Sequence, residues 1–240
     1  MISDMQRNDT MELTKKISTT VNQDGITGLV WKTVKKAAGF LFYSTCSTWF
    51  ECRMGKPEKL IIPDFQTEIN MLEADKGNLI EWLLEHRSQY PWIYSEKEIM
   101  SAQLNNHQFL MLKHYQEIIG YVKIGFGPTY INDFARSITF DTETAFIYDT
   151  FILPEYRGKS LAVFMLNELT DNLRAQGIKR IICHIEKWNV PSIKSFSRAG
   201  FKEKMTIRLI RTIGISIYIK NGSRLISDIE KELGQSKTSS

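Results

Sequence analysis

The chain has 240 residues, of which 42% are hydrophobic and 24% are charged, so it carries enough apolar residues for one full-sized core. Its net charge of +4 is too small to indicate binding of nucleic acid, and no apolar run reaches the roughly 20 residues needed to cross a bilayer. The three cysteines are too few and too scattered to form a disulfide framework, and no Cys/His cluster has the spacing of a zinc site. We therefore expect a cytoplasmic protein that binds no metal.

The first 63 residues divide into two segments. Residues 1–25 are polar and predict a flexible leader without the hydrophobic region of a secretory signal. Residues 26–42 repeat apolar residues at helical spacing with lysines between them, and residues 40–50 are aromatic and β-branched, so they either continue this helix or form a strand. Two interpretations of this extension (residues 26–63) remain: a basic amphipathic helix on a membrane surface, or, as we favour, an extra helix and strand packed on the following domain.

The elements that follow are short and regular. We predict strands at 59–62 and 65–72, helices at 79–86 and 95–104 with an aromatic loop between them, and a hairpin of strands 109–115 and 118–126 with its turn at Gln116-Glu117. Next come strands at 145–153, 180–185, 205–213 and 215–220, with helices at 161–175 and 191–199. This alternation indicates an α/β (α+β) domain over residues 64–222, followed by a helix and tail at 223–240.

A basic turn joins the strand at 145–153 to the helix at 161–175. Its sequence is Tyr156-Arg157-Gly158-Lys159-Ser160. Free backbone N–H groups and the positive end of the helix dipole converge at such a turn, and two cationic side chains stand beside them. The turn therefore predicts a phosphate-binding site.

A second signal begins about thirty residues further along, at Asn189, and ends with Arg198-Ala199-Gly200-Phe201. Together with the basic turn, this segment resembles the GCN5-related N-acetyltransferase (GNAT) superfamily, whose enzymes use acetyl-CoA. The order of strands and helices over residues 65–220 is also that of the GNAT fold. The resemblance implies a mixed central β-sheet with splayed strands, flanked by helices.

The resemblance also implies where acetyl-CoA would bind. Its pyrophosphate would lie against the basic turn, and its pantetheine arm would pair with the backbone of the strand before that turn. Asn189 would contact the arm, although it is equally suited to cap a helix. Ser160 stands where the family pattern has its middle glycine. The residues expected to bind the cofactor are Phe151, Ile152, Leu153, Arg157, Gly158, Lys159, Ser160, Leu161, Ala162, Asn189 and Ser192.

Acetyl transfer to an amine needs a group that accepts the amine proton. In many relatives a glutamate stands five positions before the Asn, and His184 occupies that position here, where an imidazole is a suitable base at neutral pH. Asp149 is the second candidate and Glu186 the third, and each has an alternative structural role. The family's usual proton donor, a tyrosine seven residues after the Asn, is replaced by Phe196, which leaves Tyr148 or water to protonate the thiolate.

The expected function is acetyl-CoA-dependent transfer to a small-molecule or peptide amine, by direct attack on the thioester. Two alternatives remain. The first is a long-chain N-acyltransferase whose acyl chain is lined by residues 40–50. The second is a non-catalytic module of the GNAT fold that binds acyl-CoA or a membrane. The acceptor, and whether the chain forms a homodimer, stay open.

Overall fold

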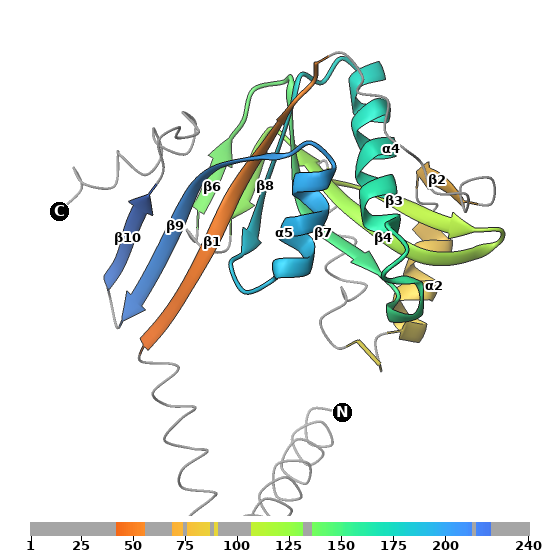
Figure 1. Cartoon of the computed structure of the whole chain (residues 1–240), viewed down its shortest axis with the longest axis horizontal. Coiled ribbons are helices and arrows are strands. Elements are labelled where there is room, and N and C mark those ends of the chain that lie inside the picture. The colour runs from red at the N-terminus through yellow and green to blue at the C-terminus, as the bar shows by residue number, and fades with distance from the viewer. Residues whose placement is uncertain are drawn as a thin grey trace, which may run out of the picture. The chain divides into compact units, whose positions relative to one another are not determined.

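The computed structural model describes residues 42–55, 69–73, 76–86, 89–90, 107–131, 136–212 and 215–221 (Figure 1). The leader, the helices predicted at 26–42, 95–104 and 223–233, and the strand predicted at 59–62 lie outside these residues. The chain splits into two compact units, one of Met1–Thr45 with Leu209–Tyr218 and one of Cys46–Arg208 with Ile219–Ser240. The site described below lies within the second unit.

A mixed β-sheet forms the centre of the second unit, with the strand order β9-β1-β8-β7-β4-β3-β2. Strands β7 and β8 are parallel, and the pairs β1–β8, β4–β7, β3–β4 and β2–β3 are antiparallel. The strands are β1 (Phe42–Arg53), β2 (Ile69–Glu73), β3 (His107–His114), β4 (Glu117–Phe126), β7 (Thr144–Ile152), β8 (Arg180–Glu186) and β9 (Lys202–Thr212). A last strand, β10 (Ile215–Asn221), follows β9. The mixed sheet that the sequence predicted is therefore confirmed.

Helices cover both faces of this sheet. Helices α4 (Leu161–Ala175) and α5 (Val190–Arg198) lie over one face (Figure 1). The apolar stripe of α4, with Leu166, Leu169 and Leu173 fully buried, packs into one cluster with Ile147 of β7 and Cys183 of β8. Helix α2 (Lys76–His86) packs on the other face against Tyr121 and Phe151. No described helix is long and apolar enough to cross a membrane.

The open question about residues 40–50 is answered by β1, which is a strand inside the sheet. Its residues pair antiparallel with β8, from Ser47 opposite Glu186 to Arg53 opposite Arg180. Trp49 and Phe50 are both buried, because strands flank β1 on each side and its two faces are covered. The predicted extension thus contributes a strand to the sheet of the following domain.

One local prediction was wrong. The hairpin turn lies at Tyr115-Gln116, one residue earlier than predicted, and Tyr115 takes the left-handed conformation there with φ 51°. After β4 ends at Phe126, Gly127, at φ 67°, turns the chain directly into a small two-stranded sheet. Its strands, β5 (Pro128–Ile131) and β6 (Arg136–Thr139), were not predicted. Proline is tolerated as the first residue of a strand, which is its position in β5.

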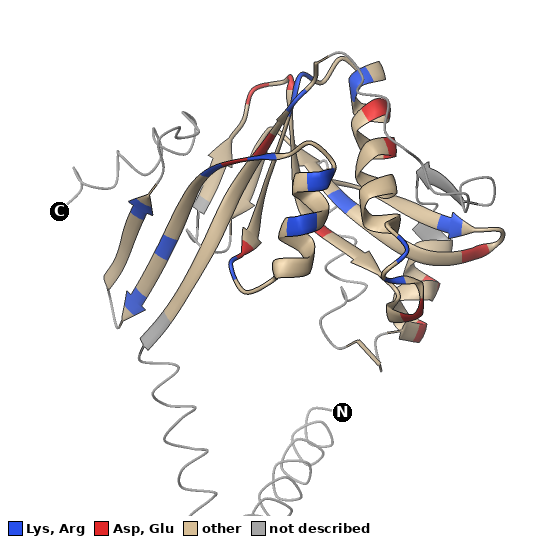
Figure 2. Cartoon of the chain, in the orientation of Figure 1, with Lys and Arg blue, Asp and Glu red and all other residues tan. Residues whose placement is uncertain are grey.

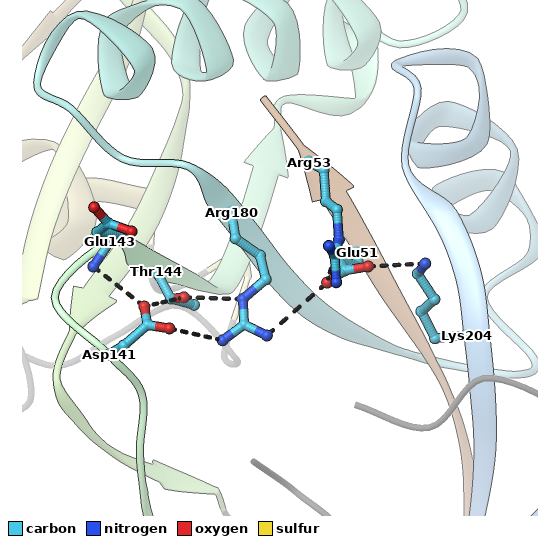
Figure 3. Close-up of polar contacts among 7 residues, drawn as sticks. All are labelled: Glu51, Arg53, Asp141, Glu143, Thr144, Arg180 and Lys204. Atoms are coloured by element: carbon cyan, nitrogen blue, oxygen red, sulfur yellow. Dashed lines mark hydrogen bonds and ion pairs between the residues drawn. The ribbon is translucent and has the colours of Figure 1, made fainter. Parts of the chain in front are cut away.

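A polar network crosses four neighbouring strands of the sheet, in the order β9, β1, β8 and β7 (Figure 3). The Glu51 carboxylate of β1, only 4% exposed, lies 2.8 Å from Lys204 Nζ of β9 and 3.2 Å from Arg53 Nε. Arg180 Nη1 of β8 lies 3.9 Å from the same carboxylate, while its Nε donates to Thr144 Oγ1 and its Nη2 pairs with Asp141. A buried acidic residue is therefore surrounded by three cations.

Candidate active site

The site begins where β7 and β8 separate. The two strands pair in parallel from Thr144 opposite Arg180 to Ile147 opposite Cys183, and the pairing ends there. A cavity of about 220 Å³ lies at this separation, lined by residues of both strands that include Asp149, His184 and Glu186. The sequence-predicted proton acceptors are therefore brought together on one cavity.

A β-bulge at Tyr148 aims two polar side chains into the same region. Along β4 and β7, Lys123 pairs with Asp149, but the next residue, Ile124, pairs with Ile147, so Tyr148 is the extra residue. Successive side chains of a strand normally point to opposite faces, and one inserted residue cancels that alternation. Tyr148 therefore contacts Phe146, and Asp149 contacts Tyr121, on the same face of the sheet.

The basic turn forms the wall of a second, larger cavity of about 430 Å³. A short 3-10 helix (Pro154–Tyr156) leads into the turn, in which Gly158 has φ 80° and Ser160 has φ 59°. Both conformations are left-handed, which glycine adopts freely and serine does not. The first N–H groups of α4 have no acceptor within the helix, and Leu161 and Ala162, which carry two of them, line this cavity. The turn therefore offers donors for an anion.

Most of the predicted cofactor residues line this larger cavity. They are Phe151, Ile152, Arg157, Gly158, Ser160, Leu161, Ala162, Asn189 and Ser192. Leu153 and Lys159 do not line it. The backbone of Leu153 is already engaged, because its N–H donates to Ile119 O at 2.9 Å and its C=O accepts from the Tyr156 N–H at 3.0 Å.

Arg157 is anchored to β7. Its Nε donates to Ile152 O at 2.9 Å, and its guanidinium lies 5.6 Å from the centre of the Phe151 ring. One side of this cation therefore fixes the turn against the strand, and the residue still lines the cavity. A second cation not singled out from the sequence, Arg198 of α5, also lines it and donates from Nη2 to Ser160 Oγ at 3.3 Å. Helix α5 carries basic residues and no acidic one (Figure 2).

Asn189 lies between the two cavities. It lines both, together with Thr150, Ser192 and Phe196. Its side-chain Oδ1 accepts from the Ser192 N–H at 3.3 Å, so Asn189 caps α5 as the sequence allowed. The two cavities are therefore adjacent, and these four residues lie between them.

The Asp149 carboxyl is half-buried and receives a hydrogen bond from the Tyr121 hydroxyl at 2.8 Å. Burial raises the pKa of this carboxyl, and the hydrogen bond from Tyr121 and the nearby charge of Lys123 counteract part of that effect. A carboxylate with a raised pKa is a better proton acceptor than an ordinary surface aspartate.

The side chains of His184 and Phe196 pack against aromatic rings, and the phenol of Tyr148 is partly buried. His184 stacks on Trp49 of β1, with ring centres 5.0 Å apart, and lies 5.9 Å from the Phe146 ring. Phe196, at the position of the missing proton donor, is buried and packs edge-on against Phe201. Tyr148 lines the smaller cavity, and burial raises the pKa of its phenol, which favours the protonated, proton-donating form.

Sequence reasoning missed several residues of the same region. Tyr121 and Lys123 of β4 were treated only as part of an apolar strand, and His107 of β3 was not singled out. A lysine within the run Tyr121-Val122-Lys123-Ile124 was an available signal, since charged residues are rarely buried without a partner. Gly125 is also required here, because a Cβ on it would come within 2.6 Å of the Tyr148 ring and 2.7 Å of the His107 ring.

We expect Ser160→Gly to stabilise the protein by about 1 kcal/mol, because a left-handed conformation costs a non-glycine residue about that much. Ser160 has φ 59°, and the hydrogen bond its hydroxyl accepts from Arg198 is exposed. Urea unfolding measures the effect. Ser197→Gly, within α5, is the matched control and should lose about 0.5–1 kcal/mol. A loss of stability in Ser160→Gly would contradict the strain assigned to this residue.

Comparison with known proteins agrees with this arrangement. The model of the Acetyltransferase (GNAT) family matches residues 76–201, which is more than half of the chain. A curated relative, the uncharacterized N-acetyltransferase YycN of Bacillus subtilis (strain 168), is 23% identical over 124 residues, covering 47% of this chain and 73% of its own.

Solved structures show the same fold. An acetyltransferase from the GNAT family of Colwellia psychrerythraea superposes with a TM-score of 0.50 at 18% identity, covering 71% of this chain and 56% of its own. A GCN5-related N-acetyltransferase from Sphaerobacter thermophilus superposes with a TM-score of 0.51 at 12% identity, covering 84% and 59%. This chain thus spans less than two thirds of either of those chains. Because the family model spans both helices and the strands of the two cavities, the chain belongs to the GNAT acetyltransferase family.

Proposed function

We propose that the protein transfers an acetyl group from acetyl-CoA to a primary amine. The observation that carries the proposal is the pair of adjacent cavities. One is lined by the start of α4 and by Arg157 and Arg198, which suits a pyrophosphate, and the other is lined by the candidate proton acceptors. The cofactor's arm would run from one to the other along the edge of β7 that faces β8, beyond Ile147, where the pairing of the two strands has ended.

The reaction would proceed by direct attack. The amine nitrogen attacks the thioester carbonyl carbon, the new C–N bond forms, and the C–S bond breaks. The amine loses one proton to a base of the protein, and the CoA thiolate takes up one proton. Holding the two reactants together supplies much of the rate, so few catalytic side chains are required.

Asp149 is the base that we favour over His184. Its carboxyl has a raised pKa, is fixed by Tyr121, and belongs to the bulge beside the expected thioester. The ring of His184 is fixed by stacking on Trp49, which suits a packing role. Tyr148 is the side chain that we favour as proton donor to the thiolate, because it lines the same cavity and Phe196 has no hydroxyl.

The test of the function is CoA binding followed by turnover. Acetyl-CoA should raise the melting temperature of the purified full chain, since a ligand that binds only the folded state stabilises it by about 2.7 kcal/mol at a hundredfold excess over Kd. Thiol release should then appear with acetyl-CoA and at least one amine of a panel of small amines and peptides. Absence of any shift at millimolar acetyl-CoA would refute the proposal, and a shift without turnover would favour the non-catalytic module.

We expect Arg157→Glu to abolish the acetyl-CoA-dependent increase in melting temperature. The change releases the anchor to Ile152 and places a negative charge against the cofactor's pyrophosphate. Arg208→Glu is the matched control, because it makes the same charge change on an exposed position of β9 outside the cavity. An undiminished shift in Arg157→Glu would move the phosphate site away from this turn.

The long-chain alternative is less well supported. It needs residues 40–50 to line an acyl chain, but Trp49 and Phe50 are buried within the sheet, and neither lines the two cavities. The same thiol-release assay with longer acyl-CoAs decides it, because a long-chain enzyme would prefer them to acetyl-CoA.

A further inference from the structure

We propose that Tyr121, assisted by Lys123, is a positioning residue that holds the Asp149 carboxyl ionised and oriented toward the amine. The inference rests on the proposed function only in naming Asp149 as the base. The hydroxyl of Tyr121 donates to Asp149 Oδ2 at 2.8 Å. Neither residue of β4 was assigned a role from the sequence or by the family match.

Tyr121 is rigidly held, as a positioning residue must be. Its side chain is 0% exposed and its ring stacks on Phe151 at 5.8 Å. Trp82 of α2 meets the same ring edge-on at 6.2 Å, and Phe109 of β3 lies 6.1 Å away. These three rings fix the Tyr121 ring, and its hydroxyl donates to the Asp149 carboxylate.

Lys123 places a positive charge near the Asp149 carboxyl. It is the register partner of Asp149 across β4 and β7 and is 8% exposed. Its Nζ lies 4.8 Å from the Tyr148 ring and 5.8 Å from the Phe109 ring, so aromatic faces stabilise the cation. The nearby positive charge lowers the pKa of Asp149, in the same direction as the Tyr121 hydrogen bond.

The other titratable groups around this carboxyl do not duplicate that effect. They are His107 on β3, Tyr148 on β7, and His184 and Glu186 on β8. Burial and the charge of Lys123 lower the pKa of His107 to about 4, so this imidazole is neutral at pH 7. Tyr121 and Lys123 are thus the groups on β4 that offset the burial of the base.

The direct test is the titration of Asp149 itself, which needs no acceptor. In the full chain with isotope-labelled aspartate, NMR follows the carboxyl carbon of Asp149, assigned by its loss in Asp149→Asn. Tyr121→Phe removes only the donor, so the pKa of Asp149 should rise by about one pH unit. Lys123→Met should also raise the pKa of Asp149, whereas Lys123→Arg, which keeps the charge, should leave this pKa unchanged. Tyr130→Phe, at an exposed tyrosine of β5, is the control and should leave the pKa of Asp149 unchanged.

The kinetic test uses whichever amine of the panel supports thiol release. In Tyr121→Phe the acid limb of the kcat/KM profile should move to higher pH by the same amount as the pKa of Asp149. Turnover should recover at high pH. The increase in melting temperature with acetyl-CoA should persist. An Asp149 titration that does not move in Tyr121→Phe overturns the positioning role. An acid limb that stays in place while the titration moves also overturns it, because Asp149 would then not be the base. Absence of turnover with every amine refutes the proposed function instead, and the titration still decides the role of Tyr121.

Discussion

Replacing Asp149 with Asn is expected to lower the rate of acetyl transfer by about 10²–10⁴-fold, the usual contribution of a general base. The change keeps the shape of the side chain and leaves the Tyr121 hydroxyl an acceptor, so the local structure should be retained. Because the pKa of the carboxyl is raised, the rate of the wild-type protein should fall with decreasing pH from a point above the ordinary aspartate value of 3.8. Thiol release over a range of pH measures both effects.

The variant His184→Ala decides whether Asp149 or His184 is the base. His184 lines the same cavity but is stacked on Trp49, so we expect a smaller loss of turnover from its removal. Both variants should keep the melting shift with acetyl-CoA, because neither residue lines the larger cavity. If His184→Ala lost turnover and Asp149→Asn kept it, the base would be His184.

Glu51→Ala should be the most destabilising of the single substitutions considered, by about 3–5 kcal/mol, because it removes the counter-charge that Lys204 contacts and one of the two carboxylates that Arg180 faces. The side chains of Lys204 and Arg180 are each only 15% exposed, and both face Glu51 (Figure 3). Urea unfolding at pH 7 measures the loss. Glu143→Gln is the control, because its ion pair with Lys179 is exposed and should contribute about 1 kcal/mol or less.

The same network predicts a dependence of stability on pH. Burial raises the pKa of Glu51, but hydrogen bonds from Lys204 and Arg53 and their charges outweigh it, so the pKa is lowered from 4.5. A group with a lowered folded-state pKa stabilises the fold above its unfolded pKa and loses that contribution as the pH falls through the folded value. The difference in unfolding free energy between wild type and Glu51→Gln should therefore be largest at neutral pH and shrink below pH 4.5. A difference that does not change with pH would contradict the charged network.

Periodicity and turn chemistry were sufficient for the elements around the larger cavity. The apolar stripe of α4, the basic turn before it and the cap at Asn189 are local signals, and each lies where it was predicted. The strand β1 could not be decided locally, since residues 40–50 fit a helix or a strand until the partner β8 is known. The strands β5 and β6 were not predicted, because each has only four residues.

The lining of the smaller cavity was harder to predict, for a physical reason. Tyr121, Lys123 and Asp149 meet only through strand register, and the bulge at Tyr148 reverses which residues share a face. A one-residue insertion of this kind leaves no trace in the alternation of a strand that is buried on both faces. The basic turn, by contrast, consists of consecutive residues.

The position of β1 in the sheet also determines when the protein can fold during synthesis. Its partner residues on β8 lie between 127 positions (Arg53 and Arg180) and 139 positions (Ser47 and Glu186) further along the chain. A ribosome that has just released β1 therefore exposes Trp49 and Phe50 while most of the domain is still unmade. Contacts at such sequence separation form slowly, so the nascent chain presents an aromatic strand with open edges until β8 emerges. Slower translation should lengthen that exposure and raise the aggregated fraction, and chaperones that bind extended apolar segments should have their main target at β1.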